Sequence, residues 1–112
     1  MPHSDGMQIV RTSPYLRKAS KLFSEDELRA AEDEIAADPL HWPVIKGTGG
    51  CRKARAGRGG SGKRGGVRMI YFFRASADTI YMLTIYAKSE KENLTKAEEK
   101  ELRKAVLLVE KS

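Results

Sequence analysis

Two long apolar segments that follow each other closely, residues 67–74 and 79–87, constrain the fold more than any other part of the chain. Their sequences, VRMIYFFR and TIYMLTIYA, are rich in β-branched and aromatic residues and in methionine, which is typical of β-strands. Only residues 75–78 separate them, so the connection is a turn. Because both segments are apolar almost throughout, we expect the two strands to pair as a hairpin in the centre of a sheet.

The N-terminal part of the chain carries the signals of a short strand and of helices. Residues 7–11 form a candidate strand, and Ser13 followed by Pro14 is typical of an N-cap and the first position of a short helix. The sequence SEDE at 24–27 is a capping box, and the helix that it begins must end before Pro39. The two helices are predicted to form an antiparallel hairpin that covers an apolar surface.

A short strand and a last helix complete the predicted elements. Residues 51–56 alternate, with Cys51, Lys53 and Arg55 on one face. Thr95 opens a second capping box, which begins a helix that runs almost to the C-terminus. The order strand-helix-helix-strand-strand-strand-helix indicates an α+β fold, a small antiparallel sheet with the helical hairpin and the C-terminal helix packed on one face.

The length and composition exclude several classes of protein. At 112 residues we expect a disordered tail at 1–6 and a single domain at 7–112. The one cysteine, Cys51, excludes an internal disulfide and a cysteine-based zinc site, and the two histidines lie far apart, so we predict no metal and no cofactor. No apolar run approaches the roughly 18 residues that span a bilayer, and no signal peptide is visible, so we expect a cytoplasmic protein without a membrane partner.

Positive charge is concentrated in the stretch 46–74, which contains nine Lys and Arg and no Asp or Glu. The other twelve cations face fifteen acids, so the formal net charge of +6 is a local +9 on a body of −3. Such a field indicates a polyanionic partner, and phosphate is the commonest. A charge run alone is typical of a solvated loop, but this one leads into strand 67–74, which can hold cations in place. The nine cations are Lys46, Arg52, Lys53, Arg55, Arg58, Lys63, Arg64, Arg68 and Arg74.

Two functions fit this stretch equally well, passive binding of nucleic acid and cleavage of RNA. In cleavage, a ribose 2′-OH attacks the neighbouring phosphorus, which requires a base, an acid and cations around the developing dianionic phosphorane. The stretch has no histidine, so a pair of imidazoles is not available, and no carboxylate, which argues against a Mg²⁺-dependent nuclease. The residues alone do not decide between binding and cleavage.

Lysine and tyrosine are the candidates for proton transfer. A lysine among arginines has its charged form disfavoured, which suits a base, and this describes Lys53 and Lys63, with Lys88 further out. Tyr71 and Tyr86 offer a phenol, although a tyrosine on a central strand is more often part of the core.

Trp42, the only tryptophan, has two interpretations. An aromatic residue in an irregular segment usually packs that segment against the core. An exposed indole face can instead stack on a nucleobase.

Three motifs, GTGGCRKAR at 47–55, GKRGGVRMIYFF at 62–73 and LTIYAKSEKENLT at 83–95, resemble the RelE superfamily of bacterial toxins, and most closely its HigB-type branch. The resemblance extends from about residue 8 to residue 110, in the same order of elements. It implies a ribosome-dependent mRNA endoribonuclease that acts in the ribosomal A site, and because the basic stretch has no carboxylate we expect it to act without a metal. It also implies a cognate HigA-type antitoxin with a helix-turn-helix, through which alone operator DNA is contacted.

The resemblance also assigns roles to residues. The catalytic cations of the family fall on Lys53 and Arg55, on Arg68 at the start of the next strand, and on Lys88 after the last strand. Arg55 and Arg68 are expected to stabilise the phosphorane, with Lys53 or Lys63 assisting proton transfer. The remaining cations of the stretch are expected to contact RNA or the ribosome, namely Lys46, Arg52, Arg58, Arg64 and Arg74.

Two positions depart from the RelE pattern. Ser89 stands where an arginine is expected after Lys88, and residues 94–112 contain no tyrosine. Either Tyr86 or Tyr71 takes the place of the missing tyrosine, or lysine acts alone. ParE-type members of the superfamily attack DNA gyrase and lack the catalytic cations, so a gyrase inhibitor and a non-catalytic RNA- or ribosome-binding module are the alternative functions.

Overall fold

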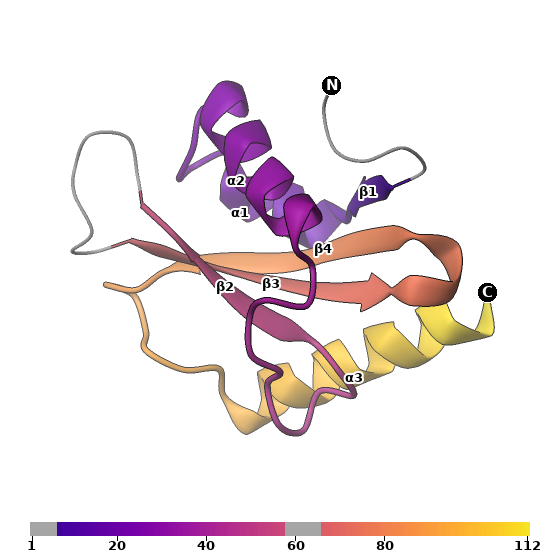
Figure 1. Ribbon diagram of the computed structural model, residues 1–112. Helices are drawn as coiled ribbons and strands as arrows, with labels where there is room; N and C mark the ends of the chain where they lie inside the picture. Colours follow the sequence, from indigo (N-terminus) through magenta and orange to yellow (C-terminus); the bar gives the residue numbers. More distant parts are fainter. Residues whose placement is uncertain (1–6, 58–65) are drawn as a thin grey trace.

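The computed structural model describes residues 7–57 and 66–112 and contains a four-stranded sheet between two helical layers (Figure 1). The predicted α+β class and order of elements are confirmed. The elements are β1 (Gln8–Arg11), α1 (Ser13–Ala19), α2 (Glu25–Ala37), β2 (Arg52–Ala56), β3 (Val67–Arg74), the 3₁₀ turn η1 (Ala75–Ala77), β4 (Thr79–Ala87) and α3 (Lys96–Lys111).

The strand order is β1-β4-β3-β2, so the predicted central hairpin is confirmed as β3 and β4. Asp78, with a φ of 47°, ends the turn between them. The prediction of a purely antiparallel sheet is wrong, because β1 pairs with β4 in parallel, from Gln8 opposite Thr79 to Arg11 opposite Met82. The helical hairpin brings the chain back to the end of the sheet where β1 began, so that β2 starts there too. As a result β1, β2 and β4 run in the same direction, and β3 runs against them.

The helices cover both faces of the sheet, and the prediction that they all pack on one face is wrong. One core cluster joins α1 and α2 to the sheet and includes Tyr15, Leu28, Ile35, Met69, Tyr71 and Met82. The other joins α3 to the opposite face and includes Ile70, Phe72, Leu83, Leu102 and Val106. The physical reason lies in β3, whose consecutive residues are apolar on both faces, so that each face requires a cover. The second face of the sheet, which helices on one face alone would leave open, is therefore covered in the described part of the chain.

A β-bulge in the hairpin decides which side chains of β4 share a face. The pairing changes from Ile70 opposite Thr84 to Tyr71 opposite Met82, so Leu83 is an extra residue. Beyond the bulge the alternation of faces is reversed. Tyr86 consequently belongs to the α3 cluster, although Met82, an even number of residues away, belongs to the other.

The helix starts agree with the capping signals in two cases out of three. The capping boxes at Ser24 and Thr95 are both present, as predicted. The N-cap of α1 is Thr12 rather than the predicted Ser13, and its hydroxyl donates to the Met82 carbonyl at 2.8 Å instead of capping the helix. Among the described residues, no helix has the length and apolar character that crossing a bilayer requires.

A buried carboxylate connects β1 to both helices of the hairpin. Glu32 of α2 has a side chain only 4% exposed and accepts hydrogen bonds from the Arg11 guanidinium at 2.9 Å and the Tyr15 hydroxyl at 2.7 Å. Arg11 also pairs with Glu25 at 3.0 Å. Burial and the Glu32 hydrogen bond raise the pKa of Tyr15, so its hydroxyl remains a donor.

Candidate functional site

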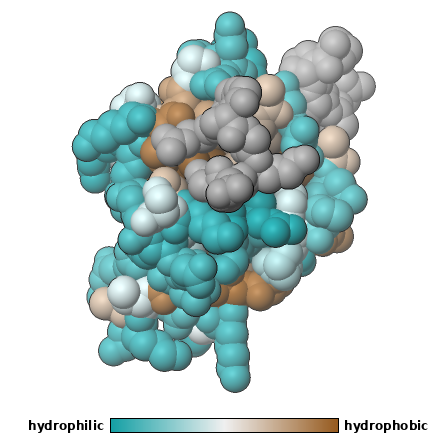
Figure 2. Space-filling model, turned by 90° about the vertical axis from the view of Figure 1, so that its left-hand side faces the viewer, coloured by the Kyte–Doolittle hydropathy of each residue, from teal (hydrophilic) through white to brown (hydrophobic). Residues whose placement is uncertain are grey.

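A row of three side chains crosses the sheet at the end where β2 leaves it. Arg55 of β2 lies directly opposite Arg68 of β3, and Arg68 lies directly opposite Tyr86 of β4. All three occupy the α3 face. Cys51, four residues before Arg55, and Ile70, two residues after Arg68, belong to the α3 cluster, and Tyr86 is itself a member of it. Figure 2 views the molecule from this end, and most of the described surface there is hydrophilic.

The two arginines and a lysine meet in one pocket of about 370 Å³. Arg55 comes from the end of β2, Arg68 from the start of β3, and Lys88 from the residue after β4. The Lys88 N–H donates to the Gly66 carbonyl at 2.9 Å, which holds the end of β4 against the start of β3. We name this space the basic pocket, and its lining is Trp42, Arg55, Ala56, Gly57, Gly66, Arg68 and Lys88.

The cations of the basic pocket lack ion pairs within the described part of the chain, although Arg55 also lines a second hollow with Glu27 and Glu34. Neither Arg55, Arg68 nor Lys88 forms an ion pair with any carboxylate in residues 7–57 and 66–112. The Arg68 guanidinium donates a long hydrogen bond of 3.4 Å to the Val67 carbonyl. Three positive charges around one hollow produce a field that attracts an anion, and guanidinium groups suit phosphate oxygens.

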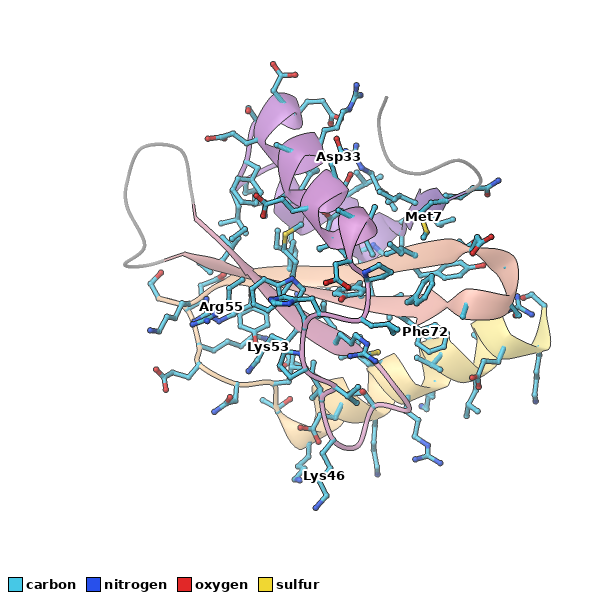
Figure 3. All side chains as sticks on the ribbon, in the orientation of Figure 1. Met7, Asp33, Lys46, Lys53, Arg55 and Phe72 are labelled. Carbon is cyan, nitrogen blue, oxygen red and sulfur yellow. The ribbon has the colours of Figure 1, made fainter. Side chains whose placement is uncertain are left out.

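The predicted alternation of side chains between the two faces of β2 is confirmed. Lys53 shares the face of Arg55, two residues earlier, but does not line the pocket (Figure 3). Arg52 occupies the other face, where its Nη1 donates to the carbonyl oxygens of Trp42 at 2.6 Å and Leu40 at 3.3 Å. Lys53 thus flanks the pocket, and Arg52 is engaged in holding the segment before β2.

The two candidate tyrosines differ in position. Tyr71 is buried on the α1–α2 face, donates to the Pro39 carbonyl at 2.7 Å, and its burial raises its pKa to about 12. Tyr86 is 3% exposed, and its hydroxyl has no hydrogen-bond partner among the described residues. Burial raises the pKa of Tyr86, while the charge of Arg68 opposes that shift. Only Tyr86 adjoins the basic pocket, through Arg68.

The other predicted cations are not brought to the pocket or lie outside the described residues. Lys46 extends away from Lys53 and Arg55 in Figure 3. Arg74, six residues beyond Arg68 and therefore roughly 20 Å along the same strand, donates to the Ser112 carbonyl at 3.0 Å. Arg58, Lys63 and Arg64 lie in 58–65, outside the described residues.

Sequence reasoning missed the pocket residues without charge. Gly57 directly follows β2, and Gly66 directly precedes β3. Because neither has a side chain, they leave room in the pocket between Arg55 and Arg68. Glycines placed at both ends of a strand connection were the signal that could have found them. Trp42 was left with two interpretations, and it both packs against the α1–α2 core cluster and lines the basic pocket.

Three other features of the described chain do not suit metal binding, thiol chemistry or phosphate. In the described ranges, no three His, Cys, Asp or Glu are grouped so that they could hold a metal ion. Cys51 is fully buried, which raises its thiol pKa to about 11 and makes it unreactive. A groove of about 430 Å³ between α1 and α3 is mainly apolar and contains Lys18 as its one cation, so it does not suit phosphate.

A comparison with protein families gives a match over almost the whole chain. The model that matches is described as the RelE toxin of the RelE / RelB toxin-antitoxin system, and it matches residues 7–111.

Proposed function

Because this chain belongs to the RelE toxin family, the toxins of toxin–antitoxin pairs, we propose that it stops translation by cutting mRNA in the ribosomal A site. A cognate antitoxin is the partner that the family implies. The observation that carries the proposal is the basic pocket, which Arg55 of β2, Arg68 of β3 and Lys88 after β4 line together without an ion pair to a described carboxylate.

The proposed reaction is attack of a ribose 2′-OH on the adjacent phosphorus, which forms a 2′,3′-cyclic phosphate and breaks the bond to the 5′-oxygen, and that oxygen takes up a proton and leaves as a 5′-hydroxyl. Arg55 and Arg68 bind the non-bridging oxygens, where negative charge develops in the transition state. Lys53, flanking the pocket, is the proposed acceptor of the 2′-OH proton, a role that Lys63 shares as a candidate. Lys88 adds positive charge to the lining of the pocket. No step requires a metal ion.

Tyr86 has a supporting place in this proposal. It lies directly opposite Arg68, and its raised pKa keeps the phenol protonated at neutral pH. Because the Tyr86 side chain is almost fully buried, we propose that it packs beside Arg68 and holds that arginine in position, and that it does not contact the phosphate. The proposal includes RNA and ribosome contacts for Lys46, Arg52 and Arg74, and for Arg58 and Arg64, which lie outside the described residues.

We further propose that the toxin belongs to the HigB-type branch and that its antitoxin is of the HigA type. The support is the set of three sequence motifs at 47–55, 62–73 and 83–95. In this arrangement, the helix-turn-helix of the antitoxin contacts operator DNA, and the toxin reaches the operator only through its partner.

The function is tested with purified toxin and a defined mRNA, free or bound to programmed ribosomes. We expect the mRNA to be cut at the A-site codon on ribosomes and to remain intact when free. Ribosome binding without cleavage would indicate a non-catalytic module. Growth arrest in cells without new mRNA ends would favour a gyrase inhibitor instead.

A further inference from the structure

The segment that carries Trp42 is held rigidly beside the basic pocket. Besides the two bonds from Arg52, the Tyr71 hydroxyl donates to the Pro39 carbonyl at 2.7 Å, and the Lys53 N–H donates to the Pro43 carbonyl at 3.1 Å. These bonds fix the backbone on both sides of the indole to buried or strand residues. An irregular segment with this many anchors positions its side chain as firmly as a strand does.

The indole is neither fully buried nor free in solvent. It packs against the α1–α2 core cluster, stays partly exposed, and forms part of the wall of the basic pocket. The Arg55 guanidinium lies over the ring at 5.9 Å from its centroid, and His41 contacts it edge-on at 4.9 Å. A flat aromatic surface is thus presented directly beside the cations that we assign to phosphate.

We propose that Trp42 is a base-stacking subsite, which holds a nucleobase of the RNA whose phosphate lies between Arg55 and Arg68. The proposal rests on the proposed function for the kind of ligand. A guanidinium and a nucleobase are both flat groups that favour the face of an indole, so the site that Arg55 occupies in the free protein fits a base. When the base stacks on Trp42, Arg55 leaves the ring and turns to the phosphate.

This arrangement couples recognition of a base to completion of the cationic site. In the free protein, the Arg55 guanidinium lies over the Trp42 indole. An abasic strand offers nothing to displace it. The strand that has a base therefore stacks on Trp42 and also receives a contact from Arg55 to its phosphate.

The chain provides its own reporter, because Trp42 is its single tryptophan. The probe is a hexanucleotide in which every 2′-OH is methylated, so that it cannot be cut, and the matched control is the abasic strand with the same phosphates. At low salt we expect the base-containing strand to quench the Trp42 emission and to bind roughly tenfold more tightly, because the base stacks on the indole. Binding of both strands is measured independently by fluorescence anisotropy of a terminal label.

Two variants distinguish stacking from packing. Trp42→Phe keeps an aromatic face, and Trp42→Leu keeps an apolar side chain that packs against the core without one. We expect Trp42→Phe to retain most of the base preference and Trp42→Leu to lose it while still binding the abasic strand. Thermal melting of both variants verifies that they are folded.

The outcomes separate this inference from the proposed function. Binding of the labelled strand without a change in Trp42 emission would overturn the inference, and so would equal affinity for the abasic strand. A base-dependent quench without cleavage on programmed ribosomes would support the stacking subsite and reject the nuclease.

Discussion

Replacement of Arg68 by alanine is expected to lower the rate of mRNA cleavage on programmed ribosomes by about 10²–10³-fold, the usual cost of removing one preorganised transition-state donor. Arg68 lies at the centre of the Arg55–Arg68–Tyr86 row and lines the basic pocket. The Arg68 charge stabilises the phosphorane more than the bound substrate. The substitution should therefore lower kcat more than it raises KM. The measurement is a single-turnover rate with toxin in excess over programmed ribosomes.

The controls for this variant test charge, geometry and folding separately. Arg103→Ala removes an exposed arginine from α3 and should leave the rate unchanged. Arg68→Lys keeps the charge without the planar fork and should give an intermediate rate. The melting temperature of Arg68→Ala should stay near that of the unmodified chain, since its recorded bond is a long one to a backbone carbonyl. Equal losses for Arg103→Ala and Arg68→Ala would remove the pocket from the mechanism.

Replacement of Glu32 by alanine is expected to destabilise the fold by about 3 kcal/mol, at the lower end of the cost of breaking a buried ion pair. The change leaves the Tyr15 hydroxyl and part of the Arg11 guanidinium without the acceptor that now lies at 2.7 Å and 2.9 Å. Arg11 is 23% exposed and keeps Glu25, which limits the loss. For a chain of this length, the melting temperature should fall by roughly 10 °C.

Glu34→Ala is the matched control, because Glu34 is an exposed glutamate on the same helix. Its effect should lie within about 0.5 kcal/mol, as for most surface substitutions. If the Glu32 variant had the melting temperature of the unmodified chain, the contacts of Glu32 with Arg11 and Tyr15 would not be what holds β1 to the helical hairpin.

The elements that the sequence predicted well depend on neighbouring residues. The Ser24 and Thr95 capping boxes involve side chains three residues apart, and the β3–β4 hairpin is closed by a short turn. The alternation of Lys53 and Arg55 is likewise a local property of β2. Such features follow from covalent connectivity and need no knowledge of the rest of the chain.

The features that the sequence did not predict depend on distant pairing. The parallel contact of β1 with β4 joins residues about seventy positions apart, and the cover of α3 follows from an apolar surface on both sides of β3. The position of Tyr86 opposite Arg68 depends on the bulge at Leu83, which no local pattern announces. The register that puts Arg55 opposite Arg68 is also set across a long connection.

The most direct test of the proposed reaction is the chemistry of the RNA ends made by purified toxin on programmed ribosomes. Attack by the 2′-OH leaves a 2′,3′-cyclic phosphate on the upstream fragment and a 5′-hydroxyl on the downstream one, and one 2′-deoxynucleotide at the cut site should abolish cleavage. Fragments with a 5′-phosphate, or cleavage that survives the 2′-deoxy substitution, would contradict the account.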